Sequence, residues 1–164
     1  MRRIGLIVVA VVAVAAGAWF ALTPADAGGP VKARLQALSE MVNRSTVDGL
    51  GPEARAVQLG AFFTEDVDVD LGQGAAPIRG RNTVIGMAER LQPRTAAFRL
   101  RFEDVSVVIA ADGNTADVHL TAEFIRRSIT TGEESLDARE FMLGMRRVGA
   151  EWQIAKVTAV ETLK

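Results

Sequence analysis

Three carboxylates in the stretch TEDVDVDLG are the first candidates for a functional site in this chain. Asp66, Asp68 and Asp70 stand at every second position, with apolar residues between them. Carboxylates in this pattern can ligate a metal ion, take part in acid–base catalysis, or form the solvated face of a β-strand. A calcium loop needs Gly at its sixth position and Glu at its twelfth, where this chain has Leu71 and Pro77. The sequence therefore predicts no metal site here, and the alternation favours a strand.

The remaining inventory of reactive side chains is short. The 164 residues include one histidine, His119, and no cysteine or tyrosine. Without cysteine there are no disulfides and no thiolate nucleophiles or ligands. Lys and Arg number 19 against 20 Asp and Glu, a net charge of -1. This balance gives no electrostatic footprint for nucleic acid, and the length suffices for one domain with its own core.

An apolar run follows a basic start at the N-terminus. Arg2 and Arg3 precede an uncharged segment, residues 4–22. As a helix this run is roughly 28 Å long, close to the thickness of a bilayer core, which predicts a membrane anchor. The pattern Ala-Asp-Ala that ends at Ala27 instead predicts an export signal cleaved after that residue. A buried core helix is the third interpretation.

Either export interpretation places the domain in the periplasm or on the extracytoplasmic face of the membrane. If the signal is not cleaved, residues 4–22 tie the chain to the membrane. The predicted organisation is a signal or anchor over residues 1–27, a linker over 28–30 and a domain over 31–164.

The spacing of apolar residues after the linker predicts three helices and five strands. The helices are expected near residues 30–42, 52–63 and 82–91, and the strands near 64–71, 95–109, 117–124, 141–145 and 152–157. Asn82 is expected to cap the third helix. Both Phe102 and Val105 have to face inward, so a β-bulge is expected at Glu103 and Asp104. Helices followed by a run of strands joined by tight turns predict an α+β fold with an antiparallel meander.

Three motifs in this order resemble the nuclear-transport-factor-2-like superfamily, which includes SnoaL-type cyclases, scytalone dehydratase and ketosteroid isomerase. They are FFTED at residues 62–66, PIRGRNTV at 77–84 and AEWQIAKV at 150–157. The resemblance covers roughly residues 31–163. It implies a cone-shaped α+β barrel, in which three N-terminal helices pack in the concave face of a curved, mostly antiparallel sheet. It also implies an open-ended pocket inside the cone and a homodimer formed through the sheet.

The resemblance also suggests an acid–base pair. Dehydratase and cyclase members use a His with an Asp, and here His119 and Asp70 are the candidates for moving a proton beside a carbonyl. The isomerase mechanism does not transfer, because its oxyanion hole needs a Tyr that this chain lacks. In its strand His119 alternates with Val118 and Leu120, which have to face the helices. The same alternation turns the three Asp outward. The alternation of the strands therefore predicts that His119 and Asp70 lie outside the cone, which disfavours an acid–base pair in its interior.

Ligand binding without catalysis is the interpretation that the sequence favours. The cone implies an inner wall of apolar side chains that would suit a small apolar molecule, although the same residues would also form any packed core. The candidates for this wall are Phe63, Met87, Leu91, Phe98, Leu100, Leu120, Phe124, Phe141, Leu143 and Trp152. The arginines of the strands are expected on the outer face, in cross-strand charge pairs: Arg99, Arg101, Arg126, Arg127, Arg146 and Arg147.

Three functional hypotheses follow from these observations. The first is an exported or tethered domain that binds a small apolar ligand or a protein partner without catalysis. The second is a cofactor-independent lyase, isomerase or cyclase that uses Asp70 and His119. The third is an accessory domain of a cell-envelope complex. The sequence leaves open whether the chain is an enzyme, and it implies neither a cofactor nor a metal.

Overall fold

The computed structural model of the chain describes residues 27–44, 51–72, 74–91, 96–128 and 130–160. Among these residues no helix has the length and apolar character needed to cross a membrane; the apolar run at 4–22 lies outside them. The elements in chain order are α2 (Gly29–Arg44), α3 (Pro52–Gly60), β1 (Phe63–Asp70), β2 (Ile78–Arg79), α4 (Arg81–Leu91), β3 (Ala96–Ile109), β4 (Thr115–Ser128), β5 (Glu134–Val148) and β6 (Glu151–Ala159).

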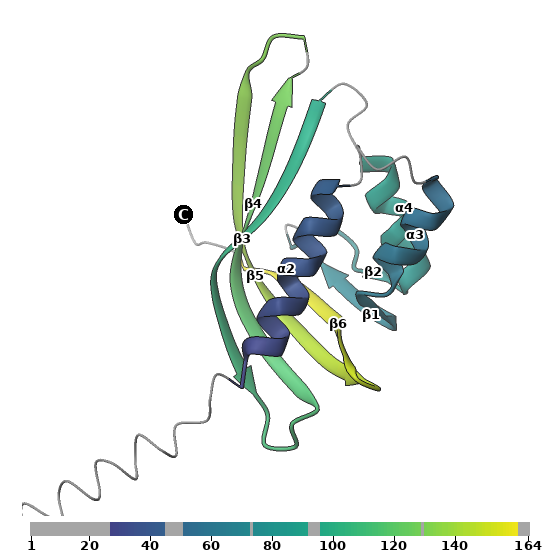
Figure 1. The fold of residues 1–164 in the computed structure, drawn as a ribbon, viewed down its shortest axis with the longest axis vertical. Helices are drawn as coiled ribbons and strands as arrows, with labels where there is room; N and C mark the ends of the chain where they lie inside the picture. The colour runs from purple at the N-terminus through teal and green to yellow at the C-terminus, as the bar shows by residue number, and fades with distance from the viewer. Residues whose placement is uncertain (1–26, 45–50, 73, 92–95, 129, 161–164) are drawn as a thin grey trace, which may run out of the picture.

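The three helices lie on one side of a curved six-stranded sheet (Figure 1). The strand order is β2-β1-β6-β5-β4-β3, and every neighbouring pair is antiparallel except β1 with β6. This arrangement confirms the predicted α+β fold with helices in the concave face of a mostly antiparallel sheet. The two-residue strand β2 is an addition to the five strands that the sequence predicted.

Helix α2 packs one apolar stripe into the concave face. Val31, Leu35 and Leu38 recur at three- and four-residue spacing, and all three are buried. This spacing places them on one face of a helix. The helix begins at Gly29, where Gly28 accepts the Lys32 amide at 3.0 Å, so the helix starts inside the predicted linker.

The long strand β3 bends at the expected bulge. Its register with β4 shifts between Glu103 and Ser106, and Asp104 has a φ of 53°. Two residues of β3 therefore stand opposite one residue of β4, which returns Val105 to the concave face. The need to place both Phe102 and Val105 inward predicted this bulge, and the structure confirms it.

The start of α4 differs from the prediction. The helix begins at Arg81, and the Gly80 carbonyl accepts the amides of Thr83 and Val84, both at 3.1 Å. Gly80, with a φ of 85°, therefore occupies the cap position that was assigned to Asn82. The Arg81 side chain turns back and donates from Nε to the Phe63 carbonyl at 2.9 Å, which ties α4 to β1.

Candidate functional site

The three carboxylates of the acidic stretch lie on the convex face of β1, away from the helices. Val67 and Val69 are buried in the core between them. Because side chains alternate along a strand, Asp66, Asp68 and Asp70 point to the opposite side. The period of the sequence predicted this orientation.

Each of these carboxylates has a structural partner. Asp66 pairs with the Arg146 guanidinium, and Asp68 Oδ2 lies 3.6 Å from Arg79 Nε. Asp70 accepts the Gly72 amide at 2.9 Å, which forms a turn at the strand end.

The partners of Asp66 also change its acidity. The Thr64 hydroxyl, the Asp66 backbone amide and the Arg146 guanidinium lower the pKa of Asp66 below its ordinary value. The acidic stretch therefore works as a charge-paired outer face of the sheet. Among the described residues, no three His, Cys, Asp or Glu side chains converge in a way that could hold a metal ion.

His119 lies on the convex face of β4. Its side chain is 51% exposed, and Nε2 lies 3.9 Å from Glu140 Oε2. Strands β5 and β6 separate β4 from β1, so His119 and Asp70 are three strand spacings apart, roughly 14 Å. The structure does not bring the proposed acid–base pair together, and both residues lie on the face opposite the helices.

The strand residues predicted for an inner wall lie on the concave side of the sheet. Those buried in the core are Phe63, Leu100, Leu120, Phe141, Leu143 and Trp152. Phe98 and Phe124 are half-buried, pack against that core, and place their ring centroids 6.1 Å apart. Met87 is half-buried on α4, and the side chain of Leu91 lies outside the described residues. Most residues of the predicted wall therefore belong to the packed core. The half-buried rings of Phe98 and Phe124 lie at the edge of this core and are partly accessible to solvent.

Polar side chains continue the concave face beyond this pair. Arg126 stands directly opposite Phe98, and Asp137 stands directly opposite Phe124. Residues opposite each other in an antiparallel pair share a face. Arg139 lies on the same face, two positions after Asp137, and its Nε is 3.4 Å from Asp137 Oδ2. The aromatic pair is thus bordered by two guanidinium groups and one carboxylate.

The expectation that all strand arginines lie on the outer face is wrong for Arg126 and Arg147. Consecutive residues of a strand face opposite sides, so Arg126 and Arg127 cannot share a face. The register places Arg126 opposite Phe98 and Arg147 opposite Trp152, both on the concave side. A sequence signal existed for Arg126, because it follows the inward-facing Phe124 by two positions.

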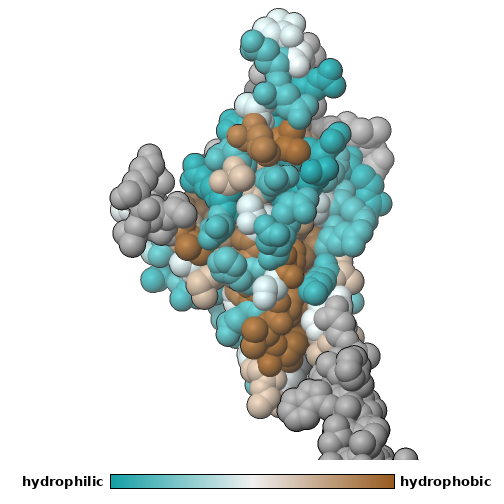
Figure 2. All heavy atoms as spheres, turned by 90° about the vertical axis from the view of Figure 1, so that its left-hand side faces the viewer, coloured by the Kyte–Doolittle hydropathy of each residue, from teal (hydrophilic) through white to brown (hydrophobic). Residues whose placement is uncertain are grey.

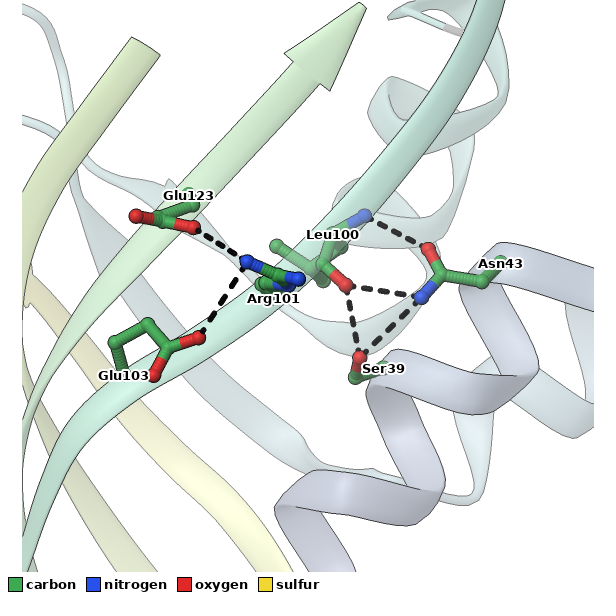
Figure 3. A network of polar contacts seen from close by, with 6 residues as sticks. All are labelled: Ser39, Asn43, Leu100, Arg101, Glu103 and Glu123. Atoms are coloured by element: carbon green, nitrogen blue, oxygen red, sulfur yellow. Dashed lines mark hydrogen bonds and ion pairs between the residues drawn. The ribbon is translucent and has the colours of Figure 1, made fainter. Parts of the chain in front are cut away.

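The C-terminal end of α2 is fastened to the edge strand at Leu100 (Figure 3). Asn43 accepts the Leu100 amide at 2.7 Å and donates to its carbonyl at 2.9 Å. Ser39 donates to the same carbonyl at 2.9 Å. Asn43 thereby satisfies both backbone groups of an edge residue, as a neighbouring strand would. This clamp fixes α2 beside the concave aromatic pair.

The convex face is mixed in character. Viewed from that side, apolar patches stand among hydrophilic side chains (Figure 2). Val108, Leu136 and Met142 are 65%, 61% and 53% exposed there. The homodimer through the sheet stays a prediction.

The solved structures that resemble this chain share its fold at low sequence identity. Aln2 from a Streptomyces species has a TM-score of 0.65 at 16% identity, over 79% of this chain and 86% of that one. A protein of Novosphingobium aromaticivorans, provisionally named a scytalone dehydratase, has a TM-score of 0.65 at 13% identity, over 82% and 83%. A provisionally named dehydratase of the NTF2-like family from Streptomyces avermitilis has 0.64 at 16% identity, over 82% and 96%.

No protein-family model matches the sequence, and no curated protein is similar to it in sequence. The chain has the cone-shaped α+β fold of the nuclear-transport-factor-2-like proteins, as the three sequence motifs implied. At these identities the likeness establishes the fold alone.

Proposed function

We propose that this domain binds a small, largely apolar molecule on the concave face of its sheet without catalysing a reaction. The observation that carries the proposal is the half-buried pair Phe98 and Phe124, which lies where the packed core becomes accessible. Small-molecule sites are lined mainly by apolar and aromatic side chains, with a few polar groups that fix the orientation of the ligand. The concave face offers this combination next to Arg126 and Asp137.

The geometry of the titratable residues supports binding over catalysis. General acid–base catalysis requires the acid and the base to lie within hydrogen-bond reach of one substrate. His119 and Asp70 are three strand spacings apart on the convex face, and Asp70 is already engaged by the Gly72 amide. The dehydratase names belong to the neighbouring structures, whose identity to this chain is low.

Export, with or without a membrane tether, is part of the proposal. Its support is the basic start and the apolar run at residues 4–22. N-terminal sequencing of the native protein separates the two versions. A first residue of Gly28 in the soluble periplasmic fraction means a cleaved signal, and an intact N-terminus in the membrane fraction means a tether. Recovery of the intact chain from the cytosol would contradict both.

A calorimetric titration of the full chain with 1-naphthaleneacetamide, a neutral aromatic probe, tests the binding proposal. We expect saturable binding that Phe124→Ala weakens by about tenfold, because the removed ring contributes about 1.5 kcal/mol of apolar contact. Leu136→Ala is the matched control, since Leu136 is an exposed apolar residue of the opposite face, and it should leave the affinity unchanged.

Two results would contradict the binding proposal. One is the absence of saturable binding to the wild-type chain. The other is a loss of affinity in Leu136→Ala with none in Phe124→Ala, which would move the site to the convex face. Thermal melts of both variants establish that they are folded at the temperature of the titration.

A further inference from the structure

We infer that the ligand of the concave face is an amphipathic carboxylate, whose apolar part lies on Phe98 and Phe124 and whose charged end is bound by Arg126. This inference rests on the proposed function and specifies the chemistry of the molecule bound there. It depends on the position of Arg126 beside the aromatic pair and on which arginines of the sheet already have an acidic partner.

The register places the guanidinium next to the aromatic pair. Arg126 is the direct cross-strand partner of Phe98 and follows Phe124 by two positions on β4. Two residues along a strand span roughly 7 Å. One small molecule can therefore contact both rings and reach the guanidinium at the exposed end of the strand.

Among the described residues Arg126 has no acidic partner, in contrast to Arg101 and Arg139. Arg101 lies 3.8 Å from Glu103 and 3.6 Å from Glu123 (Figure 3), and Arg139 is held by Asp137. Arg126 is exposed and, within the part of the chain that the structure describes, forms no salt bridge.

A guanidinium matches a carboxylate with two parallel N–H donors, so a carboxylate is the group that best complements this side chain. Because Arg126 is exposed, its guanidinium can bind a ligand carboxylate with only a small desolvation cost.

Asp137 fixes the direction in which such a ligand binds. It stands opposite Phe124, one row closer to the core than Arg126, and pairs with Arg139, which lies one row deeper. The deeper guanidinium therefore already has a carboxylate partner, and a ligand carboxylate placed there would meet the like charge of Asp137. Leu100 stands opposite Phe124 and Ala122 lies one row deeper, and both are buried. The apolar part of the ligand therefore points toward the core and the carboxylate points toward the open end of the sheet.

The test compares two probes of nearly equal size, 1-naphthaleneacetate and 1-naphthaleneacetamide, by calorimetric titration of the full chain. The acid should bind the wild-type chain about three- to tenfold more tightly than the amide, as expected for one exposed charge-assisted pair. Arg126→Gln should remove this preference, because it weakens binding of the acid far more than binding of the amide. Arg127→Gln is the matched control, because it removes the same charge one residue away on the opposite face.

The outcomes separate this inference from the proposed function. Equal affinities for acid and amide in the wild-type chain, or a preference for the acid that survives in Arg126→Gln, would overturn the carboxylate inference while binding itself stands. An equal loss of preference in Arg126→Gln and Arg127→Gln would also overturn it, because the effect would then come from net charge. If neither probe binds, the proposed function fails as well.

Discussion

Arg34 is expected to hold α2 on the rest of the domain, and its replacement by Met tests this directly. The guanidinium donates from Nε to the Trp152 carbonyl at 3.1 Å and from an Nη to the Ala61 carbonyl at 2.7 Å. It also lies 3.0 Å from a Glu151 carboxylate oxygen and 4.2 Å from the centre of the Phe62 ring. One side chain thus joins α2 to the start of β6 and to the segment that enters β1.

The Arg34→Met change keeps the aliphatic stem and removes the charge. The Arg34 side chain is only 20% exposed, so its two hydrogen bonds to backbone carbonyls and its contact with the Phe62 ring stabilise the fold. The ion pair with Glu151 contributes little, because the Glu151 side chain is largely exposed and solvent screens the pair. We expect a loss of about 2–3 kcal/mol in the free energy of unfolding. For a chain of this size this corresponds to a fall in the melting temperature of about 5–10 °C.

Denaturant unfolding followed by tryptophan fluorescence measures this loss as a shift of the midpoint at constant slope. Arg44→Met is the matched control on the same helix, because Arg44 is exposed and, among the described residues, its charge pairs with Glu40 on the surface. It should cost less than about 0.5 kcal/mol. If Arg34→Met costs no more than Arg44→Met, the account of how α2 is held to β6 and β1 is wrong.

Two further predictions concern the sheet faces and the edge. The Thr64 hydroxyl and the Arg146 guanidinium lower the pKa of Asp66, so the stabilising effect of the Asp66 carboxylate is full at neutral pH and is lost as the pH falls through the folded pKa. A carboxyl NMR titration should show a higher midpoint for Asp66 in Arg146→Gln, and an unchanged midpoint would refute the pairing. Asn43→Ala should cost about 1–2 kcal/mol in urea unfolding, because the half-buried Leu100 amide loses its acceptor, and a loss below about 0.3 kcal/mol would mean that water replaces the clamp.

The features that the sequence predicted are those encoded within one element. The alternation in β4 placed His119 outside and Leu120 inside, because the two directions of a strand are set by position alone. The bulge at Asp104 was predicted for the same reason, since Phe102 and Val105 both had to be buried. The helix stripe of α2 is likewise a local pattern.

The features that the sequence did not predict depend on pairing between distant segments. The parallel register of β1 with β6 and the short strand β2 come from contacts that no local period encodes. The inward orientation of Arg126 became certain only through its register with Phe98. The cap of α4 was misplaced because Asn82 is a strong capping residue, whereas the left-handed backbone at Gly80 begins the helix two residues earlier.

Binding on the concave face can be observed by NMR on the full chain saturated with 1-naphthaleneacetate, because intermolecular NOEs locate the probe. We expect NOEs from the naphthalene protons to the rings of Phe98 and Phe124, and none to the exposed side chains of Val108 and Met142. NOEs to Val108 and Met142 without any to the aromatic pair would place the ligand on the convex face and refute concave-face binding.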